Sequence, residues 1–162
     1  MLETYYNISK AFGVSINLLQ NGEILISACG ITINKDKLDI DSKILDLISI
    51  EGLEKRIPQK SYVAINLSGK GVLQKQIERT DQISQQNFNQ ILPNATFSDF
   101  YIQNFISGDK SFISIIRKAE ADKWIEVLRK LNLIPLSVSL GCFAVSNIQI
   151  QLNSYDNEIV FD

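Results

Sequence analysis

The apolar positions of this chain follow the two-residue period of β-strands through most of its first half. Residues 11–19 alternate apolar and polar side chains, and residues 24–33 form a second apolar stretch after Asn21-Gly22. Asn-Gly between two such stretches predicts a β-hairpin with a type I′ turn, which needs positive φ at both central residues. The almost unbroken apolar run at 61–67 predicts a central strand that is covered on both faces.

A helix is predicted between the hairpin and this central strand. Ile44, Leu45 and Ile48 have the three- and four-residue spacing of one helix face. Asp41 or Ser42 would cap the first turn, because a short polar side chain can accept a hydrogen bond from the free N–H groups there. We therefore expect a helical connection between the hairpin and the central strand.

After residue 71 the pattern changes to that of a small separate unit. Its predicted elements are strands at 72–78, 99–106 and 110–118 and a helix at about 81–92. The apolar alternation from Phe100 to Ile106 predicts a sheet face packed against that helix. We therefore predict an inserted strand–helix–strand–strand subdomain at 71–118 and a main subdomain made of 1–70 and 119–162.

The clearest helical pattern covers residues 119–131. Charged residues occupy one face, and the apolar residues of the other face are Ala121, Trp124, Ile125, Leu128 and Leu131. Trp124 lies on this apolar stripe, so we interpret it as a core residue. A strand at 133–140, a helix at 141–149 and a strand from residue 158 are predicted to follow. This order of elements is typical of an α/β fold with a mixed sheet.

The amino-acid composition excludes several classes of function for this chain. The chain has 162 residues, of which 45% are hydrophobic and 21% charged, as expected for one domain or one domain with a small subdomain. A net charge of −2 disfavours nucleic-acid binding. The absence of histidine excludes Ser-His and Cys-His nucleophile pairs, and two cysteines cannot complete a four-ligand zinc site. No apolar run reaches the roughly 20 residues of a membrane span, and the start lacks signal-peptide features, so a cytoplasmic protein is expected.

The turn Ser68-Gly69-Lys70-Gly71 has some likeness to a phosphate-binding loop. Such a loop needs an earlier glycine and a Ser or Thr directly after its lysine, and here Ala64 and Gly71 occupy those positions. We interpret the segment as a turn between strands. The carboxylates along the chain have the pattern of solvated surface. We therefore predict no catalytic residue, no cofactor and no metal site, and we expect a protein that is not an enzyme.

Three segments together resemble the actin-like cytoplasmic proteins PilM, of type IV pilus assembly, and GspL, of type II secretion. The segments are VAINLSGKGVLQKQI at 63–77, SFISIIRK at 111–118 and WIEVLRKLNLIP at 124–135. The last follows a family pattern in which a helix ends in an apolar residue, glycine, leucine, any residue and proline. Here Asn132 replaces the glycine, an exchange that the left-handed helix end permits.

The resemblance implies a ribonuclease-H-like or actin-like half, a mixed sheet with flanking helices, carrying a strand–helix–strand–strand insert. In the family, the nucleotide site begins with an Asp-x-Gly strand. If residues 13–17 align with it, Ser15 and Asn17 stand where Asp and Gly belong. If residues 9–11 match the end of the phosphate loop instead, that strand is missing from this chain. No nucleotide-binding residue is carried over by either alignment. Residues 158–162 resemble the first strand of a second half, which is consistent with a fragment of a longer protein.

The function that the resemblance implies is that of a non-catalytic scaffold or adaptor. It would lie on the cytoplasmic side of a bacterial pilus-assembly or secretion platform and bind the cytoplasmic tail of an inner-membrane partner, and a homodimer is compatible with this role. The alternative is one half of a working actin-like ATPase whose nucleotide site is completed outside this chain, and a small regulatory ligand-binding module is a third hypothesis. The predicted partner-binding residues are Ser68, Gly69, Lys70, Gly71, Phe100 and Ile102.

Overall fold

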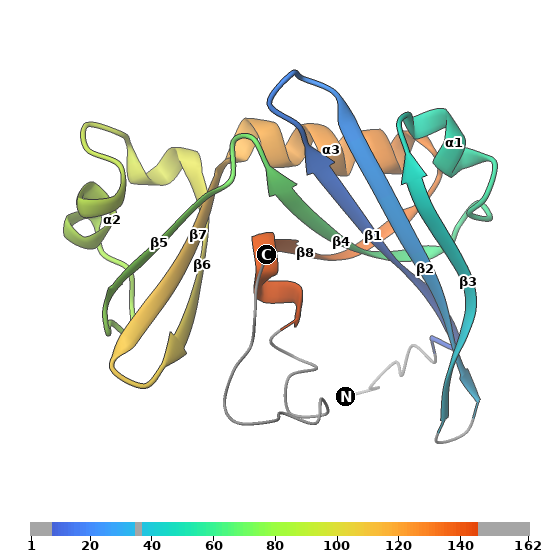
Figure 1. The fold of residues 1–162 in the computed structure, drawn as a ribbon, viewed down its shortest axis with the longest axis horizontal. Helices are drawn as coiled ribbons and strands as arrows, with labels where there is room; N and C mark the ends of the chain where they lie inside the picture. Colours follow the sequence, from blue (N-terminus) through green and yellow to red (C-terminus); the bar gives the residue numbers. More distant parts are fainter. Residues whose placement is uncertain (1–7, 35–36, 146–162) are drawn as a thin grey trace, which may run out of the picture.

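The computed structural model describes residues 8–34 and 37–145, which form two sheets and flanking helices (Figure 1). The main sheet has the strand order β3-β2-β1-β4-β8. β1 pairs antiparallel with β2, which pairs antiparallel with β3, while β1 and β4 and then β4 and β8 pair in parallel. Its strands are β1 (Lys10–Leu18), β2 (Ile24–Asn34), β3 (Lys37–Leu47), β4 (Tyr62–Gly69) and β8 (Ile134–Leu140).

The main core lies on one face of this sheet. Alternation along β1 buries Phe12, Val14 and Ile16 on that face, as the sequence predicted. The helices α1 (Ile50–Glu54) and α3 (Lys118–Lys130) cover them and contribute buried side chains to the same core. The opposite face has small residues at its centre, and the central strand β4 is therefore buried on one face only within the described part of the chain.

The predicted helix from Asp41 or Ser42 is wrong, because this segment forms strand β3 and a helix begins only after Ser49. The strand has irregular pairing with β2 at two places, between Ile40 and Ser42 and between Ile44 and Leu47, and Asp46 at the second place has positive φ. Such bulges change which side chains face the core. Ile44 is buried and its neighbour Leu45 is 65% exposed, because successive side chains of a strand point to opposite faces, and Ile48, beyond the strand, is 81% exposed. The three- and four-residue spacing of Ile44, Leu45 and Ile48 therefore belongs to an edge strand with bulges and not to a helix.

The predicted hairpin is confirmed, but its type I′ turn is wrong. Gly22 has φ +90°, while Asn21 is not among the residues with positive φ. The Gly22 N–H donates to Leu19 O (3.1 Å), and the Leu19 N–H donates to Glu23 O (2.9 Å). This is the longer hairpin loop in which a turn ends in a left-handed glycine.

The second sheet belongs to the insert and has the order β5-β7-β6 (Figure 1). Its elements are β5 (Leu73–Glu78), α2 (Gln85–Ile91), the short helix η1 (Phe97–Asp99), β6 (Phe100–Ser107) and β7 (Lys110–Arg117). Helix α2 covers one face and places Phe88 in a separate small core. The predicted start of this helix at about residue 81 is wrong: Ser84 caps α2, in a capping box with Asn87.

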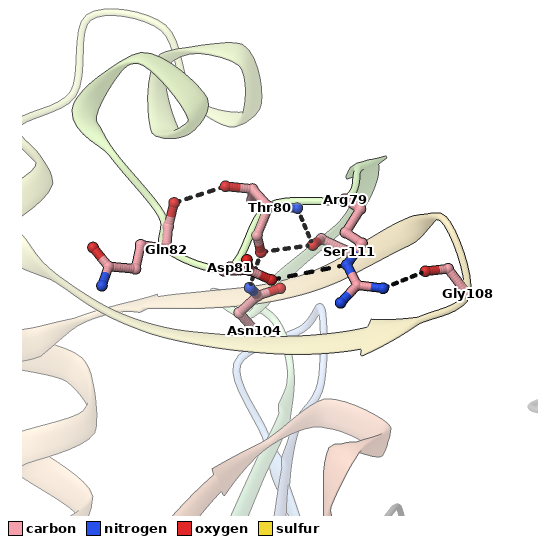
Figure 2. Close-up of polar contacts among 7 residues, drawn as sticks. All are labelled: Arg79, Thr80, Asp81, Gln82, Asn104, Gly108 and Ser111. Atoms are coloured by element: carbon pink, nitrogen blue, oxygen red, sulfur yellow. Dashed lines mark hydrogen bonds and ion pairs between the residues drawn. The ribbon is translucent and has the colours of Figure 1, made fainter.

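A polar cluster closes the end of β5, as Figure 2 shows. The fully buried Ser111 hydroxyl accepts a hydrogen bond from the Thr80 N–H (2.9 Å) and donates one to Thr80 O (3.1 Å). Asn104 Nδ2 also donates to Thr80 O, at 2.8 Å. These bonds satisfy backbone groups beyond Glu78, where the ladder between β5 and β7 ends.

Helix α3 returns the chain to the main sheet. It ends in the left-handed Asn132 (φ +59°), and β8 follows, as predicted. Gly141–Val145 then forms a short 3-10 helix, η2. The rest of the helix predicted at 141–149 and the strand predicted from 158 lie outside the described residues. The mixed sheet, its helices and the strand–helix–strand–strand insert together are the predicted fold class. The boundaries 1–70, 71–118 and 119–162 of two subdomains stay a prediction.

Candidate partner-binding groove at the sheet junction

The first crossing from the main sheet to the insert is a tight turn after β4. Gly69 has φ +83° and Gly71 has φ +91°, a region that favours glycine. The Lys70 N–H donates to Leu18 O at 2.7 Å, so the turn is fixed against the end of β1. A Cβ atom on Gly69 would lie 2.2 Å from Leu18 O. The turn therefore needs glycine at position 69 for both its φ angle and this close approach.

A groove opens beside this turn, between the main subdomain and the insert. We call it the junction groove. Its volume is about 630 Å³, within the range of about 300–1,000 Å³ that is usual for ligand pockets. It is lined by residues of the β1–β2 hairpin, the β4–β5 turn, the insert and the start of α3, which are Leu18, Leu19, Gly22, Glu23, Ile24, Lys70, Gly71, Leu73, Leu92, Phe100, Arg117, Glu120, Lys123 and Trp124.

The walls of the junction groove are mainly apolar. Leu73, on β5, is 44% exposed although it is a large hydrophobic residue. Phe100 and Trp124 are buried in the insert core and the main core, respectively, and each also contributes to the wall. The interpretation of Trp124 as a core residue is thus confirmed, with the addition that it lies between core and groove. Exposed apolar surface inside a concave site is typical of protein-binding surfaces.

Two cations of the junction groove have no acidic partner among the described residues. Lys70 Nζ donates to Gln20 O at 3.4 Å, and the guanidinium of Arg117 lies 5.1 Å from the centre of the Phe100 ring. Lys123, by contrast, pairs with Glu120 at 3.7 Å. The groove is therefore lined by three cations, Lys70, Arg117 and Lys123, and by two carboxylates, Glu23 and Glu120, which gives the lining a formal charge of +1.

The opposite face of the insert sheet is tied to the main subdomain. Gln103, on β6, donates from Nε2 to Val138 O (2.9 Å) and accepts at Oε1 from the Leu140 N–H (2.7 Å). Gln74, on β5, donates from Nε2 to the sulfur of Cys142 at 3.6 Å. These contacts fix the insert against β8 and η2, and they leave the junction groove as the larger opening between the two sheets. A smaller crevice of about 250 Å³ lies next to Gln103.

The predicted partner-binding residues are only partly brought together. Lys70, Gly71 and Phe100 line the junction groove, while Ser68 and Gly69 form the turn beside it. Ile102 packs in the insert core and borders the smaller crevice. Whether any of these residues contacts a partner stays a prediction.

The sequence analysis missed the contribution of the β1–β2 hairpin and of α3. The parallel register places Leu18 beside Gly69, so a parallel pairing of β1 with β4 was the signal that could have found the hairpin. Arg117 lies on the face of β7 that α2 covers. In the sequence it was recognisable only as a basic residue at the end of an apolar strand, which does not indicate a groove.

In the alignment that matches residues 13–17 with the Asp-x-Gly strand, the corresponding positions lie on β1. Ser15 Oγ accepts a hydrogen bond from Asn66 Nδ2 at 3.5 Å, on the small-residue face of the main sheet. The Asn17 side chain contacts the Gly69 turn. Within the described residues, no three acidic or cysteine side chains gather where they could hold a metal ion. No helix in this part of the chain has the length and apolar character needed to cross a membrane.

The fold is similar to that of two proteins of bacterial envelope machines. The cytoplasmic domain of EpsL, an inner-membrane component of the type II secretion system of Vibrio cholerae, is 10% identical, with 80% of this chain and 57% of that chain covered and a TM-score of 0.52. A chain of the PilM–PilN type IV pilus biogenesis complex is 11% identical, with 87% and 50% covered and a TM-score of 0.57. The predicted resemblance to the actin-like PilM and GspL proteins is therefore confirmed at the level of fold.

A third solved structure, a Bacteroides thetaiotaomicron protein with an actin-like ATPase fold, is 13% identical, with 93% of this chain and 60% of that chain covered and a TM-score of 0.45. This chain thus spans between half and three-fifths of the length of the three structures. No protein-family model matches the sequence. A search of curated proteins finds no match either.

Proposed function

We propose that this chain is a non-catalytic adaptor of a type IV pilus or type II secretion platform, on the cytoplasmic side of the inner membrane. Its junction groove would hold the cytoplasmic tail of an inner-membrane partner. The observation that carries the proposal is the groove itself, in which apolar walls from the hairpin, the insert and α3 meet. The fold likeness to EpsL and to the PilM–PilN complex supports the choice of machine.

Site-specific photocrosslinking in the source cell tests this function. A photoreactive amino acid at Leu73, exposed inside the groove, is expected to capture the cytoplasmic tail of an inner-membrane protein, identified by mass spectrometry of the linked peptide. The matched control places the same group at Leu45, which is more exposed but lies on the other side of the main sheet. Equal capture at both positions, or no tail captured from position 73, would contradict the proposal.

The alternative function, one half of an actin-like ATPase, is favoured by one observation. The chain covers 50–57% of the length of the EpsL and PilM–PilN chains, so a second half could complete a nucleotide site. Calorimetric titration of this chain with ATP and magnesium separates the two functions. The adaptor proposal expects no heat of binding, and tight binding would favour the ATPase.

A further inference from the structure

The partner chemistry of the junction groove follows from the net positive charge of its lining. Arg117 and Lys70 belong to the two crossings between main sheet and insert, and both border the same groove. The Phe100 ring lies against the Arg117 guanidinium, which restricts that side chain to the groove wall. A cation held in place loses less conformational entropy when it binds an anion.

One of the two carboxylates of the groove is paired with a cation. Glu120 pairs with Lys123. Glu23 Oε2 accepts a hydrogen bond from the neutral Asn21 amide (Nδ2) at 2.8 Å in the hairpin turn and keeps its charge, so the three cations of the lining exceed its carboxylates by one. Helix α3 also begins beside Arg117, with no side chain hydrogen-bonded to its first turn. The positive end of the helix dipole therefore adds to the field of the two cations.

We propose that the occupant of the junction groove is an extended apolar peptide segment with an acidic side chain, whose carboxylate binds Arg117 and Lys70. This rests on the proposed function and specifies the partner's chemistry. The apolar walls would bury the flanking side chains of the peptide, and the planar guanidinium can donate two hydrogen bonds to one carboxylate. A lysine at the same place in the peptide would meet two like charges.

The single tryptophan of the chain gives a direct readout, because Trp124 lies in the groove wall. Its fluorescence is followed during titration of the full chain with three capped eight-residue peptides that alternate leucine and threonine. The three peptides carry a central aspartate, asparagine or lysine. We expect the aspartate peptide to bind at least about tenfold more tightly than the lysine peptide, since hydrogen bonds to charged groups are the stronger class. Added salt is expected to reduce this preference.

Substitutions test whether Lys70 and Arg117 cause the preference for the aspartate peptide over the lysine peptide. The double variant Lys70→Gln/Arg117→Gln is expected to bind the aspartate and lysine peptides within about twofold of each other, whereas Lys55→Gln, at an exposed position directly after α1 and outside the groove, keeps the wild-type preference. Far-ultraviolet circular dichroism confirms that each variant is folded. Three outcomes would overturn the inference: no binding of the aspartate peptide, equal or tighter binding of the lysine peptide, or an unchanged preference in the double variant.

The failure of this inference is distinguishable from failure of the adaptor function. If position 73 captures an inner-membrane tail whose linked segment has no acidic residue, the adaptor function stands and the acidic-peptide inference falls. If it captures no tail at all, the adaptor function falls, whatever the peptide titration shows.

Discussion

At the scale of single residues, Ser111 illustrates how a buried polar group supports the insert. Its hydroxyl is both acceptor and donor for the backbone of Thr80. Ser111→Ala leaves the Thr80 N–H without its partner, while Thr80 O keeps the hydrogen bond from Asn104, so we expect a loss of about 1–3 kcal/mol of unfolding free energy in urea titrations. The exposed Ser107→Ala, in the same sheet, should change it by less than about 0.5 kcal/mol. A similar small effect for both variants would contradict this role.

The end of α3 depends on the left-handed conformation of Asn132. A β-carbon is unfavourable at φ +59°, although asparagine tolerates this region better than most residues. We expect Asn132→Ala to be less stable than Asn132→Gly by about 1 kcal/mol, measured as the difference in unfolding free energy between the two variants. Equal stability of the two variants would show that the helix end does not require this conformation.

The exposed carboxyl of Asp41 makes the stability of the fold depend on pH. The hydrogen bond from Lys10, at 2.8 Å, is the main cause that lowers the pKa of this carboxyl below its ordinary value, and a bond from Thr32 adds to it. A carboxyl with a lower pKa in the folded state stabilises the fold above its unfolded-state pKa, and this contribution is lost as the pH falls through the folded-state pKa.

The unfolding free energy of Asp41→Asn should therefore fall less steeply than that of the wild type as the medium becomes acidic, in urea titrations over a pH series. Asp46→Asn is the control, because Asp46 is exposed on the same strand. If both variants followed the same pH profile, the pair with Lys10 would contribute nothing.

At the scale of elements, the sequence predicted those whose pattern was not interrupted. β1 and α3 have a regular apolar period and β4 a nearly continuous apolar run, and these three elements and β8 each lie within one or two residues of their predicted places. β3 was not predicted, because its register shifts interrupt the two-residue period of its apolar residues. α2 began later than predicted, because Ser84 and Asn87 make a better reciprocal cap than the isolated Asp81.

Gln103, on β6, connects the insert to β8, and nothing in the sequence indicates that these two strands lie close together. Its amide makes the two hydrogen bonds to β8 that a neighbouring strand would otherwise make. We expect Gln103→Ala to speed hydrogen exchange at the Leu140 amide and to cost about 1–3 kcal/mol of unfolding free energy. Gln76→Ala, an exposed residue on the same face of the insert sheet, is the control. Unchanged exchange at Leu140 would refute the connection.

At the scale of the whole molecule, the structure has two hydrophobic cores, one for each sheet. The fully buried Phe88 belongs to the insert core and Ile16 to the main core. Phe88→Ala should cost about 3–5 kcal/mol locally and raise hydrogen exchange in β5, β6 and β7 before β1 and β4 are affected. Ile16→Ala should give the reverse order. A uniform rise in both sheets for either variant would mean that the cores unfold as one.

The candidate site was less predictable from the sequence than the fold was, because the site depends on how the two sheets are placed relative to each other. The turn at Lys70 and Gly71 was visible in the sequence as a turn, but the groove depends on the angle between two sheets. That angle is set by Gln74, Gln103 and their partners, which are far apart along the chain. No local pattern reports such contacts, so Trp124 and Arg117 could not be assigned to a common surface.

The position of β5 between two different surroundings has a mechanical consequence. Leu73 borders the junction groove, and its neighbour Gln74 contacts Cys142 on the other side of the same sheet. The two faces of the insert sheet are thus in contact with two different parts of the main subdomain. A peptide that wedges into the groove would press the opposite face of the sheet against β8 and η2, where Gln103 and Gln74 already hold it.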